Sequence, residues 1–335
     1  MEKIESFNIG IAVYNEGRNI EKTMKVLFDS LSNISFKGKP HIYICFNGCT
    51  DNTISSFLIQ LRLMKKFFKI SILSSKKGKL KAHREIVSVI QNYKPILFLD
   101  ADIFVNSYVI KRLVSTLRKD NKLQVVSAYP YAIKPKNLNF YQKLLFPIIN
   151  LKRIIPQIEI AKNDVSIFHP NAKSDFERKS RIYFHGRCFI IRNKFLYSFP
   201  TSESGVIGDD TFLSFYFLQN FPPGSIKVLY DAPVYSYPQL SVVSYLKSWY
   251  RIRKDLENIY KSYPNFKPLR KYVEMKMNWQ YVLRNLSLKY KIDSMLFFLL
   301  RCFEVISYRL LRQGINADKI WNYKCKEENY EHSNS

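Results

Sequence analysis

Short apolar runs alternate with longer amphipathic segments over the first 130 residues of the chain. The runs have the length of strands, and the segments between them carry apolar residues at helical spacing. The runs lie at residues 7–13, 41–46, 70–73, 96–99 and 123–128. Apolar strands that alternate with helices predict an α/β fold, in which a mostly parallel sheet is flanked by helices on both faces.

Polar clusters follow these runs where each predicted strand ends. They contain Asn15 and Glu16, Asn47, Lys79 and Lys81, and the pair Asp100 and Asp102. Ligands of parallel sheets bind at the carboxyl ends of the strands, so we expect these side chains to share one edge. Structural roles are open as well. Asn15 can cap the next helix, Asn47 can form a turn with Gly48, and the lysines can be a solvated basic run.

Asp100 and Asp102 directly follow the apolar run at residues 96–99. Charged groups at the end of a buried strand need a partner, because an unpaired buried carboxylate is costly. Two carboxylates one residue apart can share a hard divalent cation, with phosphate oxygens in its remaining positions. The alternative interpretation is a strand end with two solvated acids that open a turn.

Strand character returns at residues 182–191, which contain His185 and Gly186, and again at 226–230. Between these two strands, Asp209 and Asp210 open a predicted helix. Acidic residues in a first helical turn complement the helix dipole, which is a sufficient structural reason for their presence. A lone histidine in a strand, such as His185, is more often packed than bound to a ligand.

The remaining segments are mainly helical. Residues 141–160 are apolar but carry basic residues and two prolines, which is typical of a core segment or of a helix on a membrane surface. Helical spacing extends from residue 241 to about 313. We therefore expect an α/β domain at 1–235, a helical region at 236–320 and a disordered tail at 321–335.

The chain carries a net charge of +26, with 53 Lys and Arg residues against 27 Asp and Glu. Such an excess attracts anionic partners, namely nucleic acid, a phosphate-bearing substrate or an anionic membrane surface. The basic residues are spread along the whole chain and form no recognisable nucleic-acid module, so nucleic acid is the least favoured partner. Five scattered cysteines, the lack of a signal peptide and the lack of a long apolar segment predict a cytoplasmic protein, soluble or peripheral on the membrane.

Five motifs in order resemble the family 2 nucleotide-sugar glycosyltransferases, which have the GT-A fold. They are Val13-Tyr-Asn-Glu16, Asn47-Gly-Cys-Thr-Asp-Asn-Thr53, Gly78-Lys79 upstream of Asp100-Ala-Asp102, Gly208-Asp-Asp-Thr-Phe-Leu213, and Leu246 to Lys254. The resemblance covers about residues 7–255, and it implies that the domain at 1–235 has the GT-A fold, binds the nucleotide sugar and is catalytic. It departs from the family pattern at Asn47, where an aspartate is usual, at Asp209, where a glutamate is usual, and around Arg251 and Arg253, where Gln and Trp are absent.

The resemblance implies an inverting transfer of a sugar from a nucleotide-sugar donor, with uracil as the expected base, assisted by Mn²⁺ or Mg²⁺. Asp102 is the expected metal ligand, Asp100 holds the ribose or shares the metal, and Asp210 is the general base beside Asp209. The expected donor site also includes Val13, Asn15, Glu16, Asn47, Lys79, and Arg251 or Arg253. His185 and Gly186 are placed at the acceptor site, where a glycine allows a sugar to approach closely.

The acceptor is not specified by the sequence. Residues 295–311 form a second amphipathic stretch, in which Arg301, Glu304 and Arg309 interrupt an apolar run. Together with the basic charge and the stretch at 141–160, it suggests a lipid-linked or membrane-proximal saccharide of a polysaccharide pathway. Two other functions remain open. One is a sugar nucleotidyltransferase, which needs a glycine-rich phosphate loop that Tyr14 to Arg18 supplies poorly. The other is a non-catalytic protein that binds membranes or nucleic acid through the same sheet.

Overall fold

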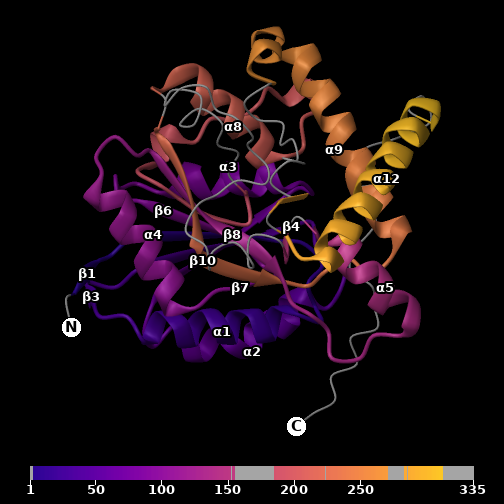
Figure 1. Cartoon of the computed structure of the whole chain (residues 1–335). Helices are drawn as coiled ribbons and strands as arrows, with labels where there is room; N and C mark the ends of the chain where they lie inside the picture. The colour runs from indigo at the N-terminus through magenta and orange to yellow at the C-terminus, as the bar shows by residue number, and fades with distance from the viewer. Residues whose placement is uncertain are drawn as a thin grey trace. The chain divides into compact units, whose positions relative to one another are not determined.

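The chain forms two compact units, shown in the computed structural model of Figure 1. The structure describes residues 3–151, 153–154, 185–222, 224–270, 283–284 and 286–311. The first unit comprises Met1–Pro130, Ala172–Ser236 and Tyr263–Glu274, and the second comprises Tyr131–Asn171, Tyr237–Ser262 and Met275–Ser335. The expected domain boundaries at residues 235 and 320 stay predictions, and the expected tail at 321–335 lies outside the described residues.

The first unit is organised around a sheet that has eight strands within the described residues. In sheet order the strands are β5 (Lys69–Ser75), β4 (His41–Asn47), β2 (Asn8–Val13), β6 (Ile96–Asp100), β9 (Cys188–Ile191), β8 (Val125–Ala132), β10 (Ile226–Ser236) and β7 (Ile103–Phe104). Neighbouring strands among β5, β4, β2 and β6 are parallel, whereas β9 runs antiparallel to both β6 and β8. The α/β class with a mostly parallel arrangement of the first strands is therefore confirmed, and the structure adds that the strand expected within 182–191 is antiparallel to its neighbours.

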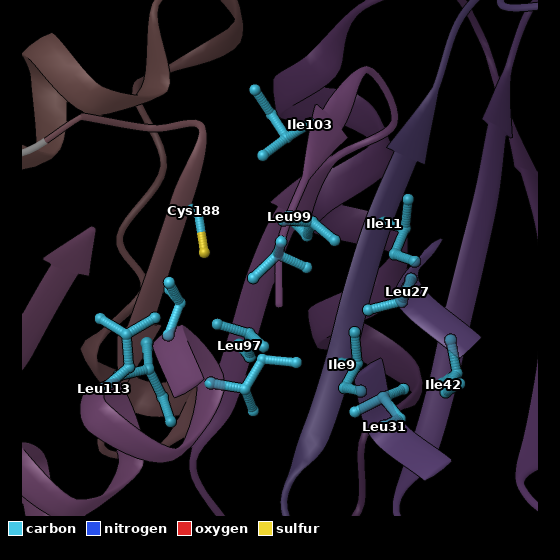
Figure 2. Packing of buried hydrophobic residues seen from close by; sticks show 14 of the residues in the cluster. Ile9, Ile11, Leu27, Leu31, Ile42, Leu97, Leu99, Ile103, Leu113 and Cys188 are labelled. Atoms are coloured by element: carbon cyan, nitrogen blue, oxygen red, sulfur yellow. The ribbon is translucent and has the colours of Figure 1, made fainter. Parts of the chain in front are cut away.

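Helices cover both faces of this sheet. Within the described residues, the helices of the first unit are α1 (Ile20–Ser32), α2 (Thr53–Met64), α3 (Lys79–Val89), α4 (Ser107–Lys119) and α8 (Asp209–Asn220), with short 3-10 turns at Lys194–Leu196, Ser202–Ser204 and Pro264–Leu269. On one face, Ile9 and Ile11 of β2 and Leu97 of β6 pack against Leu27 and Leu31 of α1 (Figure 2). The helices α2 and α4 contribute to the same core cluster.

The opposite face of the sheet is covered by α3. The side chains of Ala82, His83 and Ile86 in α3 are buried. The ring of His83 lies 4.6 Å from the ring of Phe98 in β6. Because both faces are covered, all six residues of β2 are buried, which explains why no charged side chain occurs in this strand.

The loop between β2 and α1 differs from the prediction that Asn15 caps the helix. Helix α1 begins at Ile20, and its N-cap residue is Asn19. Asn15 instead has a φ of 49°, a left-handed conformation that Asn tolerates better than most residues. Its backbone therefore turns the chain away from β2 before the helix starts. A short two-stranded sheet of β1 (Ile4–Glu5) and β3 (Phe36–Lys37) was also not predicted.

The second unit is helical in the part that the structure describes. Its helices are α5 (Phe140–Ile149), α9 (Val242–Ser262) and α12 (Leu288–Leu311). Ile149 of α5, Tyr245 of α9 and Phe297 of α12 pack in one apolar cluster. Of the apolar segment expected at 141–160, residue 152 and residues 155–160 lie outside the described residues. None of the helices in the described ranges combines the length and apolar character that crossing a membrane requires.

Candidate functional site

The strand ends that carry the predicted donor residues lie at one edge of the sheet. In the register of the parallel strands, Asp100 of β6 pairs with Ala12 of β2, one residue before Val13. Val13 pairs with Phe46 of β4, and the next residue, Asn47, is the last of that strand. The expected gathering of Val13, Asn47 and Asp100 at one edge is therefore present in the structure. Asn47 is 3% exposed, so its side chain is almost wholly covered.

The loops after β2 and β4 are tied to each other by side-chain hydrogen bonds. The Asn15 Oδ1 atom accepts a bond of 2.8 Å from the backbone N–H of Thr50, and its Nδ2 atom donates to Thr50 Oγ1 at 3.1 Å. The backbone N–H of Glu16 donates to Thr53 Oγ1 at 2.7 Å. These bonds fix the two loops together, so Asn15 has a structural role here in addition to its predicted place in the donor site.

Lys79 joins the two acidic segments of the first unit. Its Nζ atom lies 2.8 Å from Asp100 Oδ1 and 3.2 Å from Asp209 Oδ1. It also donates a hydrogen bond of 2.9 Å to the carbonyl oxygen of Gly186. One ammonium group thus contacts the end of β6, the start of α8 and the segment before β9. This contact is the central geometric feature of the candidate site.

The neighbours of Lys79 stabilise its charged form. Lys79 is the first residue of α3, where the positive end of the helix dipole disfavours a cation. Burial alone would lower the pKa of Lys79, but the carboxylates of Asp100 and Asp209 raise it above its usual value. Lys79 is therefore a charged lysine that two carboxylates compensate, whereas no comparable contact is found at Lys81 among the described residues. Of the two lysines considered from the sequence, the structure singles out Lys79.

Asp209 and Asp210 open α8 and lie against Gly186. The Asp210 Oδ2 atom accepts a hydrogen bond of 3.2 Å from the backbone N–H of Gly186. A Cβ atom on Gly186 would lie 2.9 Å from Asp210 Cβ and 3.1 Å from Asp209 Oδ1, so only glycine permits this approach. The start of α8 also takes part in aromatic packing, since the ring of Phe212 lies 5.2 Å from that of Tyr263.

A buried group behind Asp209 was not predicted from the sequence. The Nδ1 atom of His83 lies 3.5 Å from Asp209 Oδ2, and the same nitrogen is hydrogen-bonded to the Tyr197 hydroxyl. Burial and the nearby Lys79 keep the pKa of His83 well below its usual value, so the imidazole is neutral and the contact with Asp209 is not an ion pair. His83 and Tyr197 are 114 positions apart in the sequence, so no local sequence pattern could predict their contact.

Asp209 is 3% exposed, and burial raises the pKa of its carboxyl to about 7 despite the attraction of Lys79. Asp210 is only half-buried. Of the two neighbouring acids, Asp210 is therefore the one that a reactant can approach, while Asp209 belongs to the buried network of Lys79, His83 and Tyr197.

Asp100 and Asp102 have the donor atoms that a hard divalent cation requires. Burial raises the pKa of Asp100, and the charge of Lys79 opposes this effect. The neighbouring Asp102 carboxylate raises the pKa of Asp100 further, because its negative charge disfavours ionisation of Asp100. Among the described residues, no three His, Cys, Asp or Glu side chains are placed to hold a metal by themselves. Magnesium commonly takes only one or two carboxylates and completes its shell with phosphate and water, so this pair fits such an ion.

His185 and Arg187 flank Gly186. The backbone N–H of His185 donates to Ser127 Oγ at 3.3 Å, and its ring lies edge-on to Tyr129 at 5.0 Å. The packed interpretation of His185 therefore has direct support, and its acceptor role stays a prediction. The charge of Arg187 lowers the pKa of Asp100, so this arginine is close to the acidic pair. Its position next to Gly186 was the only signal that sequence reasoning could have used.

Arg251 and Arg253 lie in α9, in the second unit. The Arg253 guanidinium is bound by Glu304, with hydrogen bonds from Nε to Oε1 and from Nη2 to Oε2, the latter at 3.1 Å. Glu304 is fully buried, so this pair is part of the interior of the second unit. Arg251 is half-buried, and the assignment of either arginine to the diphosphate stays a prediction.

Comparisons with known proteins place these observations in a family. The chain is similar to solved structures of glucosyl-3-phosphoglycerate synthase from Mycobacterium tuberculosis. The complex with phosphoglyceric acid has 11% identity and a TM-score of 0.46, and covers 77% of this chain and 79% of that chain. The complex with Mn²⁺, uridine diphosphate and phosphoglyceric acid has 11% identity and a TM-score of 0.46, and the match covers 77% of this chain and 78% of that chain.

A third structure of this synthase, with Mg²⁺ and uridine diphosphate, has 12% identity and a TM-score of 0.44, and the match covers 77% of this chain and 79% of that chain. A search of curated proteins finds none that matches the chain. The model of the family described as Glycosyl transferase family 2 matches residues 8–198, more than half of the 335 residues. This match includes β2, β4, β6 and β9 with the acidic pair and Gly186 between them. The chain belongs to glycosyl transferase family 2.

Proposed function

We propose that this family 2 glycosyltransferase moves a sugar from a nucleotide-sugar donor, UDP-linked, to a saccharide or lipid-linked acceptor, with inversion at the anomeric carbon. The observation that carries the proposal is the contact of Lys79 with both Asp100 and Asp209, because it brings the acids after β6 and those at the start of α8 into one site. Had these two acidic segments lain far apart, no single site could use both.

The donor side of the site is built from the strand ends. Asp102, with Asp100, would hold Mn²⁺ or Mg²⁺, and the ion would stabilise the negative charge of the departing nucleoside diphosphate. Because Lys79 already occupies Asp100 Oδ1 at 2.8 Å, Asp102 is the better candidate for the direct ligand. Lys79 and Arg187 add positive charge beside the diphosphate, and Asn15, Glu16 and Asn47 line the strand ends where ribose and base would bind.

The acceptor side is built from α8 and the segment before β9. Asp210 accepts a proton from the acceptor hydroxyl, whose oxygen forms a bond to the anomeric carbon as the bond to the diphosphate breaks on the opposite face. The hydrogen bond from Gly186 N–H to Asp210 Oδ2 orients this carboxylate. Attack from the face opposite the leaving group inverts the configuration. We place the reaction on the cytoplasmic side of a membrane, as one step in building a polysaccharide.

Two variants separate the roles of the acids. Asp102→Asn should abolish the rise in melting temperature that a nucleoside diphosphate causes together with Mn²⁺, a rise that ligand binding to the native state produces by mass action. Asp210→Asn should keep this rise but lower the rate of sugar transfer by about 10²–10⁴-fold, the usual contribution of a general base. Asp231→Asn is the matched control, because Asp231 is an exposed acid that pairs with Arg112.

The same thermal-shift measurement distinguishes the alternatives. Stabilisation by one nucleoside diphosphate with metal supports the transferase and identifies the base. A preference for nucleoside triphosphates would indicate a sugar nucleotidyltransferase. The absence of any nucleotide effect would indicate a non-catalytic binding protein, and full transfer activity in either the Asp102→Asn or the Asp210→Asn variant would contradict the proposed roles.

A further inference from the structure

Helix α12, the yellow helix of Figure 1, exposes a row of large apolar side chains. Six large apolar side chains are between 47% and 79% exposed: Ile292, Met295, Leu299, Phe303, Ile306 and Leu310. They recur at intervals of three and four residues, so they share one side of the helix. At 1.5 Å per residue this stripe is about 27 Å long. Such a continuous apolar stripe is unusual for a helix face in contact with water.

The opposite side of α12 carries buried polar side chains. Asp293, Ser294 and Glu304 are buried together with Phe297. Glu304 is satisfied inside the unit, because it binds Arg253 of α9 and lies 2.8 Å from the Nη1 atom of Arg301. The buried Arg253–Glu304 pair therefore fixes which side of α12 faces the unit. The sequence suggested that Arg301 and Glu304 interrupt an apolar run, whereas the structure turns Glu304 inward and leaves the outward stripe unbroken.

The charges that remain at the surface of α12 have one sign. All residues of this helix are described, and its two acids, Asp293 and Glu304, are both buried. The basic residues Lys289 and Arg309 are exposed, and Lys291 is half-buried. An apolar stripe with basic residues at both ends of the helix is complementary to an anionic lipid surface, where the apolar side chains enter the acyl boundary and the cations meet the headgroups.

We propose that α12 lies in the surface of an anionic lipid bilayer and holds the protein there through its apolar stripe. A second copy of the chain is a poorer occupant, since a two-fold contact would bring Lys289 and Arg309 of two chains of net charge +26 together. The six charged residues of α12 agree with a helix that lies on the bilayer and does not cross it. This inference does not depend on the proposed sugar transfer.

The test is sedimentation of the full chain with vesicles of phosphatidylcholine, alone or mixed with phosphatidylglycerol. We expect binding to the mixed vesicles at low salt, weaker binding at high salt, and little binding to phosphatidylcholine alone. The double variant Phe303→Ser/Ile306→Ser should bind the mixed vesicles about tenfold or more weakly, since it removes two large apolar side chains from the contact. Lys289→Gln/Arg309→Gln should weaken binding by about tenfold and reduce its salt dependence.

The control is Leu58→Ser/Ile59→Ser, which removes two exposed apolar side chains from α2 in the first unit and should leave vesicle binding unchanged. Circular dichroism and the nucleotide-dependent thermal shift check that each variant is folded, and neither readout requires membrane binding. Three outcomes would overturn the proposal. They are the absence of binding by the wild-type chain at low salt, equal binding by the α12 apolar variant, or self-association in solution that the same variant abolishes.

Discussion

Asp209 and Asp210 are adjacent in sequence but have different surroundings. Asp209 is enclosed by Lys79, His83 and Tyr197, and burial raises the pKa of its carboxyl to about 7. Asp210 is half-buried and receives a hydrogen bond from the backbone of Gly186. The buried acid is therefore suited to positioning, and the more accessible acid to taking a proton. The motif alone offers two similar side chains, and only their neighbours distinguish them.

The raised pKa of Asp209 predicts a pH-dependent stability. Since the folded protein holds a proton on Asp209 up to about pH 7, whereas the unfolded chain releases it near pH 3.8, the stabilisation from this group is lost as pH rises between these values. The unfolding free energy of the wild type relative to Asp209→Asn should be lower at pH 8 than at pH 5 in urea titrations. A difference that stays constant or grows with pH would contradict the burial of this carboxyl.

The start of α3 illustrates how an element can carry a locally unfavourable residue. The helix begins with the cation Lys79 directly after Gly78, whose φ of 133° is difficult for other residues. Both residues disfavour the start of a helix, and the tertiary structure gives a reason for each. The glycine lets the chain turn from β5 into α3, and the lysine is compensated by Asp100 and Asp209 from other elements. Such conflicts between local preference and global structure are expected at functional sites.

Lys79→Gln and its matched control Lys81→Gln test this arrangement. At pH 8, replacing Lys79 leaves the buried carboxylate of Asp209 and the partly exposed carboxylate of Asp100 without their cation, which should lower the unfolding free energy by about 3 kcal/mol. It should also weaken nucleoside diphosphate binding in the thermal-shift measurement. Lys81→Gln should change stability by less than about 0.5 kcal/mol, as surface substitutions usually do. Equal effects of the two substitutions would indicate a basic run without a specific site.

The whole molecule consists of two units that are each assembled from separate stretches of the chain. The first unit contains the sheet and the acidic cluster, and the second contains α5, α9 and α12 with their own apolar cluster. A protein with two compact units need not unfold in one step. The Arg253–Glu304 pair belongs to the second unit and the Lys79 cluster to the first, so substitutions can address each unit by itself.

Glu304→Gln should therefore destabilise the second unit selectively. It leaves Arg253 and Arg301 without their buried carboxylate, at a cost of about 3 kcal/mol. In differential scanning calorimetry one transition should move to lower temperature, while the transition that shifts on adding a nucleoside diphosphate with Mn²⁺ should keep its position. The control Glu257→Gln removes an exposed pair with Lys254 and should have almost no effect. A common shift of all transitions would show that the units unfold together.

The local pattern of the chain was sufficient for the strand ends and their chemistry. An apolar run must be buried on both faces, so β2, β4 and β6 could be recognised, and with them the edge that holds Asn47, Asp100 and Asp102. The exact start of α1 could not be predicted, because Asn15 and Asn19 are both suitable caps and the backbone of Asn15 turns the other way. The side of α12 that packs inside its unit could not be predicted either. Its buried acids, Asp293 and Glu304, resemble surface residues in the sequence, and Arg253, which binds Glu304, is 51 positions away.

By itself, the sequence determined the alternation of strands and helices, the α/β class and the family, because each depends on spacing within short segments. Only the tertiary structure decided which distant groups meet. Lys79 and Gly186 are 107 positions apart, and they meet just before β9, which pairs antiparallel with both β6 and β8. Strand order in a sheet depends on packing across the whole unit, and local periodicity does not encode it.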